Sequence, residues 1–254
     1  MSDTGRELER LEIVADRTGD VGPEEGFLRL KRFRVQNVYA DGSQSAPYDC
    51  DVVSRRQPDA VAVLLYGRDA AGVHVVLRSG VRPAVYLRRH KQFVQPDVGN
   101  HLLLVEMTAG LLEDDDGGPE GVARRAAAEA REEAGFHVAV LDVQPLGAAS
   151  FPTPGISDEK VFYRAAPVDL EAGDTPRGDG SVMEEAGEVV VLPLPEAIRR
   201  CRRGEMPDMK TEVALLRLCH LIGFVPSLGC FLEDLPASIR ERAVSKLDLG
   251  LSEA

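Results

Sequence analysis

The sequence predicts an α/β (α+β) protein with a mixed β-sheet and a small N-terminal antiparallel β unit. Short runs of apolar and β-branched residues recur between Asp59 and Val191, and they surround one long helix-favouring segment. That order of elements is typical of a mixed sheet with helices on its faces. The chain has 254 residues, of which 44% are hydrophobic, which is enough for one large domain or a main domain with an appendage.

The N-terminal unit is predicted over residues 1–57. Residues Phe27–Val35 alternate between apolar and charged side chains, and a second run follows near Asp49–Val53, after an Asp41-Gly42 turn. This pattern predicts a pair of antiparallel strands. Because an isolated hairpin is marginally stable in water, we expect the unit to pack against another surface.

The main domain is predicted over residues 58–225. Pro119 suits the first turn of a helix and Gly135 suits its C-terminal stop, so the long helix is expected at Pro119–Ala134. The segments Val85–Asn100 and Ala172–Gly187 are predicted loops because they are rich in Pro, Gly and charge. The predicted strands are Val61–Leu65, Val73–Leu77, Leu102–Glu106, Val138–Val143, Lys160–Ala165 and Glu188–Leu192.

Further helices are expected near the C-terminus. One covers about Pro195–Gly204, and another begins near Asp208. Residues 226–254 form a predicted extension in which Pro236–Lys246 has a helical pattern.

Composition excludes several classes of function. With 42 acidic and 30 basic residues, the formal charge of −12 disfavours nucleic acid as a partner. No segment offers the ~18 apolar residues of a membrane span, and the N-terminus lacks the pattern of a cleaved signal, so a cytoplasmic protein is expected. The four cysteines show no metal-binding spacing, so free thiols are expected.

Three glutamates in the long helix form the strongest candidate site. Glu129, Glu132 and Glu133 stand at positions i, i+3 and i+4, which places their side chains on one helix face. Like charges at this spacing destabilise a bare helix. Hard divalent cations such as Mg²⁺ take oxygen ligands and would neutralise the repulsion. The alternative is a solvated acidic face stabilised by Arg125, one turn earlier.

The segment from Gly110 to Phe136 resembles the Nudix box of the Nudix hydrolases. Glu120, seven residues and then Ala128-Glu129-Ala130-Arg131-Glu132-Glu133-Ala134-Gly135-Phe136 fit the pattern of that box. The sequence departs from it twice. Nine residues instead of five separate Gly110 from Glu120, which is tolerable because loop entropy grows slowly with length. The arginine of the box is replaced by Ala128, and Arg125 or Arg131 could substitute for it.

Other segments resemble the ADP-ribose pyrophosphatase branch of that family, in the family's order. They cover roughly residues 27–222 and include Val75–Val85 with its Arg-Pro-Ala turn, Glu106–Gly110, Thr153–Glu159 and Pro207–Thr211. The resemblance implies a Nudix-type α/β/α sandwich. It also implies a homodimer in which the N-terminal unit exchanges between subunits and closes the active site.

The resemblance implies roles for individual residues. Glu129, Glu132, Glu133 and the Ala109 carbonyl would hold Mg²⁺ or Mn²⁺, with Glu132 as a ligand or a water holder. The base would come from the loop that contains Glu184 and Glu185; Glu185 is preferred, with a solvated loop carboxylate as the alternative.

Substrate-binding roles are expected for Arg82, Tyr48, Pro154 and Gly155. Arg82 would hold the diphosphate or ribose, or would be a surface arginine before a turn. Tyr48 would stack on the base, or would simply pack at a strand edge. Pro152 competes with Pro154 for the family's substrate-associated proline.

The first hypothesis is a metal-dependent hydrolase that splits ADP-ribose, or a related nucleoside diphosphate sugar, into a nucleoside monophosphate and a sugar phosphate. The alternative is a catalytically weakened binding or sensor protein, because Ala128 replaces the arginine of the box. The three retained glutamates favour the enzyme, since a protein that only binds has no need of clustered, mutually repelling carboxylates.

Overall fold

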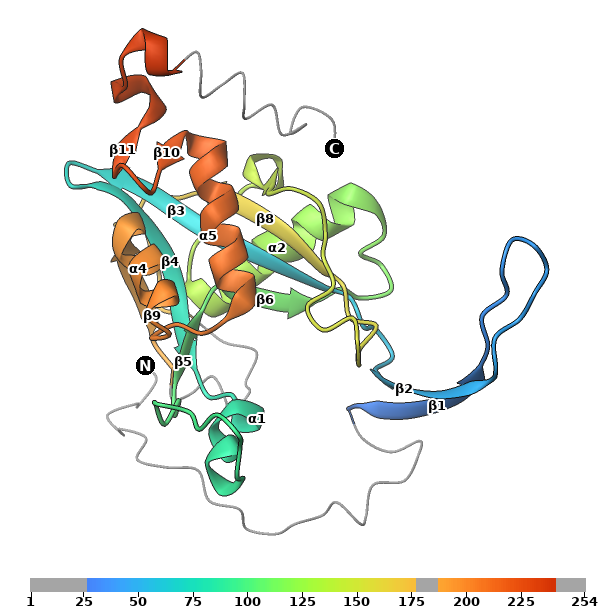
Figure 1. Cartoon of the computed structure of the whole chain (residues 1–254). Coiled ribbons are helices and arrows are strands. Elements are labelled where there is room, and N and C mark those ends of the chain that lie inside the picture. The colour runs from blue at the N-terminus through green and yellow to red at the C-terminus, as the bar shows by residue number, and fades with distance from the viewer. Residues whose placement is uncertain (1–26, 177–186, 241–254) are drawn as a thin grey trace.

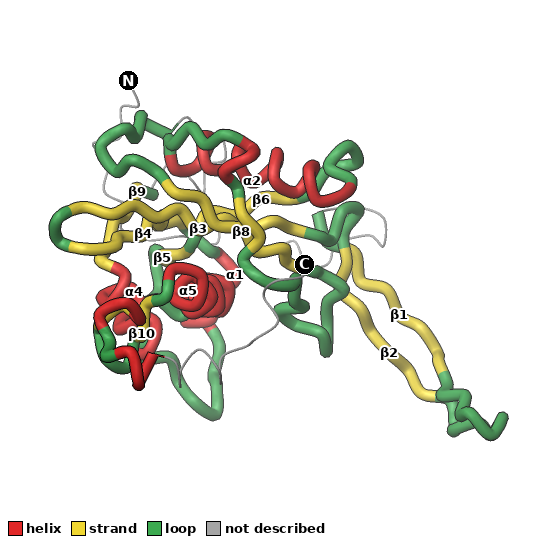
Figure 2. Tube along the Cα trace, turned by 90° about the horizontal axis from the view of Figure 1, so that it is seen from above, coloured by secondary structure: helices red, strands yellow, loops and turns green. Residues whose placement is uncertain are grey.

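The computed structural model describes residues 27–176 and 187–240, and it shows a mixed sheet between two helical layers (Figure 1). Helix α2 (Gly118–Ala134) covers one face, while α4 (Leu194–Arg202) and α5 (Met209–Ile222) cover the other (Figure 2). The predicted fold class is therefore confirmed. The main-sheet strands are β3 (Ala60–Asp69), β4 (Gly72–Gly80), β5 (Leu104–Glu106), β6 (Thr108–Leu111), β7 (Gln144–Pro145), β8 (Val161–Pro167) and β9 (Val189–Pro193).

Strand β3 is the centre of the sheet. It pairs in parallel with β8 along one edge, and on the other edge it pairs antiparallel first with β6 and then with β4. Alternate residues of β3 belong to two separate hydrophobic cores. Ala62 and Leu64 pack toward α4 and α5, while Val61 and Val63 pack toward α2. Because both faces of β3 are buried, its sequence is a continuous apolar run.

Helix α2 presents a stripe of small residues to the sheet. Val122, Ala126, Ala130 and Ala134 recur every four residues and are buried, and the alanines allow the helix to approach the strands closely. Gly135 ends the helix with a φ of 77°, and its N–H donates to the Arg131 carbonyl. The predicted start and stop of this helix are confirmed.

The sheet forks where β5 runs into β6. β5 pairs with β4, whereas β6 pairs with β3, so the chain changes neighbour at Met107. The Met107 N–H donates to the Thr211 hydroxyl over 2.8 Å. The N-terminus of α5 therefore closes the fork and satisfies a buried donor there.

The N-terminal unit forms an arm outside the main sheet. Among the described strands, β1 (Arg29–Val35) and β2 (Tyr48–Ser54) pair with each other and with no third strand, and the arm extends away from the body (Figures 1 and 2). At its base, the Val53 N–H donates to the Ile156 carbonyl over 2.7 Å. The predicted antiparallel unit is confirmed.

Two predicted elements were wrong in part. The segment Val138–Val143, predicted as a strand, instead forms the 3₁₀ turn Val140–Asp142, in which Asp142 donates to the Ala139 carbonyl. The predicted loop Val85–Asn100 begins with helical turns, α1 (Pro83–Tyr86) and η2 (Leu87–His90). Proline before the first turn fixes a helical φ there.

Several short elements had no prediction, namely β6, η4 (Leu232–Asp234) and the hairpin β10 (Phe224–Val225) with β11 (Cys230–Phe231). The predicted C-terminal helix begins with helical residues 237–240, and the rest of it lies outside the described residues, as does residue range 177–186 of the predicted loop. Within the described part of the chain, none of the helices is both long and apolar enough to span a membrane. The four cysteines are unpaired.

Candidate active site

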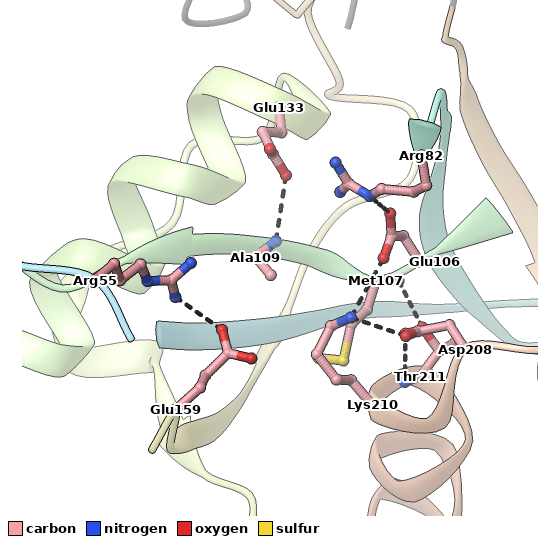
Figure 3. A network of polar contacts seen from close by, with 10 residues as sticks. All are labelled: Arg55, Arg82, Glu106, Met107, Ala109, Glu133, Glu159, Asp208, Lys210 and Thr211. Atoms are coloured by element: carbon pink, nitrogen blue, oxygen red, sulfur yellow. Dashed lines mark hydrogen bonds and ion pairs between the residues drawn. The ribbon is translucent and has the colours of Figure 1, made fainter. Parts of the chain in front are cut away.

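Two of the predicted glutamates converge on strand β6. The Ala109 N–H donates to the Glu133 carboxylate over 3.2 Å, as Figure 3 shows, so the side chain spans from the last turn of α2 to the strand. The Arg78 guanidinium also donates to the main-chain carbonyl of Glu133. These contacts fix the end of α2 against β4 and β6.

Glu129, one turn earlier, lies over Gly110. A Cβ atom at Gly110 would overlap the carboxyl group of Glu129, so this approach requires a residue without a side chain. The Glu129 side chain is only 12% exposed. Glu129 and Glu133 thus contact neighbouring residues of β6, Gly110 and Ala109 respectively.

This arrangement fits the chemistry of a hard divalent cation. Glu129 and Glu133 supply carboxylate oxygens from one helix face, and the glycine at position 110 keeps the space beside them clear of a side chain. Within residues 27–176 and 187–240, three or more His, Cys, Asp or Glu side chains do not gather in a metal-binding group. The predicted four-part metal site, with Glu132 and the Ala109 carbonyl, stays a prediction.

Of the two predicted substitutes for the missing arginine of the box, Arg125 is the one that contacts Glu129. Its guanidinium lies 2.8 Å from Asp116, 3.1 Å from Glu113 and 4.0 Å from Glu129. Burial opposes ionisation of Asp116, but the Glu113 N–H and Arg125 outweigh it, so the pKa of Asp116 lies below its usual range. Arg131, the other predicted substitute, is exposed. The geometry therefore favours Arg125.

We expect Arg125→Gln to lower turnover several-fold, because Glu129 loses its nearby cation and the loop at Asp116 loses an anchor. Arg124→Gln is the matched control, since the Arg124 guanidinium lies 3.7 Å from the same Asp116 and donates to the Asp115 carbonyl. Adding Ala128→Arg to Arg125→Gln should restore turnover. Equal kinetics for the Arg124 and Arg125 variants at matched thermal stability would refute the substitution.

A second polar network lies at the fork of the sheet. Glu106, buried in β5, accepts hydrogen bonds from Arg82 and from Lys210, the latter over 3.4 Å. Lys210 also donates to Asp208 over 2.8 Å, and Asp208 caps α5 by accepting from the Thr211 N–H and hydroxyl. In Figure 3, Arg82 approaches Glu106 from the side of α2, and Lys210 approaches from α5. Arg82 is thereby fixed to the body of the protein.

The charges in this network compensate each other. Burial would lower the pKa of Lys210, but Asp208 and Glu106 outweigh it and raise that pKa. Burial would likewise raise the pKa of Asp208, but Lys210 and Thr211 hold it below its usual range. Lys210 is therefore charged, and it pairs both with the buried Glu106 and with Asp208, whose side chain is 10% exposed.

We expect Lys210→Met to lower the free energy of unfolding by about 3 to 5 kcal/mol at neutral pH, because Asp208 loses its cation and the buried Glu106 is left with Arg82 alone. A carboxylate with a lowered folded pKa stabilises the fold above its unfolded pKa and loses this contribution as pH falls through the folded value. The deficit of the variant should therefore shrink below about pH 4. Urea titrations across pH measure it, and a pH-independent deficit would contradict the charge assignment.

The other predicted site residues lie apart from this centre. Tyr48 begins β2 at the far end of the arm, where it is 50% exposed and its hydroxyl donates to Asn37. The seven residues of β2 run from Tyr48 to Ser54 at the base, a distance of about 20 Å along an extended strand. Pro154 and Gly155 lie in an exposed turn beside Ile156, which pairs with that base. Within one chain, the structure does not bring Tyr48 to Arg82.

Glu132 is exposed on α2. Glu184 and Glu185, the predicted bases, lie outside the described residues. The turn at residues 153–157 is joined to the base of the arm by polar contacts: Ser54 donates to Asp158 over 2.7 Å, and Arg55 pairs with Glu159 over 2.7 Å. Figure 3 shows the Arg55 pair on the opposite side of Ala109 from Arg82.

Glu106 and Lys210 had no predicted site role. The signal in the sequence is a single carboxylate at the end of the apolar run Leu102–Glu106, followed far along the chain by the Asp-Met-Lys-Thr segment at 208–211. A charge at the end of a buried strand needs a partner. The sequence does not say which of its 30 basic residues is that partner.

Comparison with known proteins identifies the relatives. The chain is 34% identical over 201 residues to the GDP-mannose pyrophosphatase of Cronobacter sakazakii. The aligned region covers 77% of this chain and 92% of that protein. The chain belongs to the GDP-mannose pyrophosphatase family. The Klebsiella pneumoniae member is 32% identical, over 75% of this chain and 84% of its own length. The Salmonella arizonae member is 29% identical, over 63% and 79%. No family model matches the chain.

Family membership supports hydrolysis of a pyrophosphate bond in a nucleoside diphosphate sugar. In the Cronobacter comparison, the match covers 201 residues, whereas the helix that carries the glutamates has 17. The shared region therefore extends across most of the fold that carries the site.

Proposed function

We propose that this chain is a Nudix-type hydrolase that uses Mg²⁺ or Mn²⁺ to split the pyrophosphate bond of a nucleoside diphosphate sugar. The products would be a nucleoside monophosphate and a sugar phosphate. The observation that carries the proposal is the pair of carboxylates seated on β6, with Glu133 on the Ala109 N–H and Glu129 over Gly110. Two acidic side chains held so close together are stabilised by a bound cation.

The residues of the site have separate tasks in this proposal. Glu129 and Glu133, with Glu132 and the Ala109 carbonyl as further candidates, would hold the metal. When bound, the metal would neutralise phosphate charge and lower the pKa of a bound water. Arg82 would bind the diphosphate: its Nε–H bonds to Glu106, and Figure 3 shows its Nη atoms directed away from that contact. Glu185 or Glu184 would take the proton from the attacking water.

The relatives bear the name GDP-mannose pyrophosphatase, so GDP-mannose is the first substrate to assay, followed by ADP-ribose. The full chain is incubated with each nucleotide sugar, with Mg²⁺, Mn²⁺ or EDTA, and the products are separated by ion exchange. Cleavage of the pyrophosphate bond gives GMP and mannose phosphate, whereas cleavage of the glycosidic bond would give GDP. We expect the first pair, and only with metal.

The outcomes separate the two hypotheses. Products at the same rate in EDTA would refute the metal site. If no nucleotide sugar is cleaved but GDP-mannose or ADP-ribose binds in calorimetry, the protein is the weakened binding or sensor protein instead. The substitution of Ala128 for arginine is the observation that keeps this alternative in the experiment.

We also propose that the arm joins two chains into a homodimer. Facing residues of β1 and β2 share a side of the arm, because Phe33 lies opposite Cys50, and Val35 lies opposite Tyr48. The other side carries the ion pairs Arg32–Asp51 and Arg34–Asp49. Lys31 lies on the side of Phe33, and Leu30 lies on the side of the ion pairs, so the arm is amphipathic only toward its tip, where Phe33, Val35 and Tyr48 are exposed in a single chain. Such a surface is typical of a protein interface.

A second copy is the partner that this arm fits. Apart from the bridge between Val53 and Ser157 at the base, β1 and β2 pair only with each other among the described residues, so the edges of the arm are open beyond that bridge. Exchange of the arm would bring Tyr48 to the site of the other subunit, which accounts for its distance from Arg82 in one chain. The nucleotide base of the substrate would then stack on Tyr48.

We expect light scattering to give twice the chain mass of 27.6 kDa at micromolar concentration. Phe33→Asp, which places a charge on the apolar side, should give a monomer and lower activity more than tenfold, because the site loses the partner's arm. Arg34→Gln, on the charged side, is the control and should stay dimeric. A monomeric wild-type protein with full activity would contradict the proposal.

A further inference from the structure

The excursion between β4 and β5 encloses a pocket of its own. Its lining residues all come from residues 85–101, and its volume is about 460 Å³, which is within the usual range of small-molecule sites. Most chain connections in compact domains are much shorter than this one. A long loop that encloses a cavity with its own side chains is a frequent place for binding.

The pocket is basic in an otherwise acidic protein. Arg88, Arg89 and Lys91 line it together with one carboxylate, Asp97. Arg88 binds Asp97 through two hydrogen bonds of 2.8 and 3.1 Å, so the two charges neutralise each other. Among the described residues, Arg89 and Lys91 have no carboxylate within 4.0 Å, which leaves the pocket with a net positive charge.

The pocket also presents flat groups. The Arg88 guanidinium lies 4.0 Å from the centre of the Phe93 ring, and Arg89 lies 4.9 Å from the centre of the Tyr86 ring. The His101 ring packs on Gly99, where a Cβ atom would lie 3.2 Å from it. Tyr86 is only 2% exposed and its hydroxyl accepts from Arg89, so the flat groups open to a ligand are the Arg88–Phe93 pair and His101. Planar groups of this kind are the surfaces on which nucleobases stack.

The pocket adjoins the candidate active site. Arg82 is the N-cap residue of α1, and its carbonyl accepts from the Val85 and Tyr86 N–H groups over 2.9 and 3.0 Å. One helical turn, about 6 Å, therefore separates the arginine bound to Glu106 from the wall of the pocket. A ligand in the pocket would contact the segment that positions Arg82.

We propose that this pocket binds a nucleotide, with its phosphate on Arg89 and Lys91 and its base against the flat side chains. The inference rests on the proposed function for one of two sources of this ligand, the nucleotide end of the substrate itself, whose base would then lie in this pocket and not on Tyr48. The other source is a separate nucleotide, which would act on the site through α1. Both sources share the same chemistry, a planar base joined to an anion.

Titration calorimetry in EDTA tests binding without turnover. GMP and AMP are titrated into the full wild-type chain and into Arg89→Gln/Lys91→Gln. We expect binding to the wild type and at least tenfold weaker binding to the double variant, with an unchanged melting temperature. Arg199→Gln/Arg203→Gln, an exposed pair on or next to α4, removes the same charge far along the chain and should bind as the wild type does. Inorganic phosphate should bind more weakly than either nucleotide.

Kinetics then distinguish the two sources. If the pocket holds the substrate, the double variant raises KM with kcat nearly unchanged. If it holds a separate nucleotide, KM stays unchanged without added nucleotide, and the effect of added GMP or AMP on the rate disappears in the variant. Equal nucleotide affinity for the wild type and the double variant, or no nucleotide binding in calorimetry, overturns the proposal. If the wild type cleaves no nucleotide sugar but binds GMP or AMP, and Arg89→Gln/Lys91→Gln loses that binding, then the proposed function is refuted and the nucleotide pocket is retained.

Discussion

Glu133→Gln should lower kcat by roughly 100-fold or more while the protein stays folded, because it removes one negative charge and keeps the shape of the side chain. The glutamine oxygen can still accept the hydrogen bond from the Ala109 N–H, which spans 3.2 Å in the wild type. The packing of α2 on β6 is therefore retained. What is lost is a carboxylate ligand, so the loss should appear in turnover and not in stability.

The metal dependence of stability provides the second measurement. A cation that binds only the folded state raises the melting temperature, by an amount that grows with the logarithm of its concentration once that concentration exceeds Kd. We expect millimolar Mg²⁺ to stabilise the wild type, and this shift to vanish in Glu133→Gln. Glu120→Gln, in the exposed first turn of the same helix, is the charge-matched control. Wild-type turnover of Glu133→Gln in Mg²⁺ would show that the assignment is wrong.

Gly110→Ala should reduce activity nearly as much, although it adds only one methyl group. The new Cβ would overlap the carboxyl group of Glu129, which lies at the end of a flexible side chain and can move away. The expected result is a displaced ligand in a folded protein. We predict a fall in kcat of at least tenfold, with little change in the melting temperature.

A double-mutant cycle shows whether the effect passes through Glu129. If it does, Gly110→Ala adds little to Glu129→Gln, and the two losses are far from additive. Gly117→Ala is the control for a glycine in the same region, since a Cβ there meets nothing within 4 Å. Fully additive losses in the cycle would mean that Gly110 acts through the strand and not through Glu129.

The parts of the fold predicted correctly depend on local signals. Helix α2 was predicted because a proline at its start and Gly135 at its end are read directly from the chain. The segment Val138–Val143 was predicted wrongly because its run of apolar, mostly β-branched residues suits a strand, yet Leu141 is 97% exposed and the backbone bonds close locally. A short apolar run does not by itself distinguish a strand from a turn.

The contacts of the candidate site also divide into local ones, which the sequence predicts, and long-range ones, which it does not. Glu129 and Glu133 are one turn apart, so a shared face follows from helix geometry alone. The ion pair of Lys210 with Glu106 joins residues 104 positions apart, and such a contact depends on the packing of α5 against the sheet. Gly110 belongs to the predicted box, but the reason for a glycine there became visible only with Glu129 above it.

The exposed arm also affects how readily proteases inactivate the protein in dilute solution. All residues of β1 are exposed, and the turn between the strands lies at the far end from the body. A protease can therefore cut this turn in a lone chain without any unfolding of the sheet. Association would cover the arm, so dilution should expose the cleavage site. The lifetime of the active protein would then depend on its own concentration, even under conditions in which the main sheet never opens.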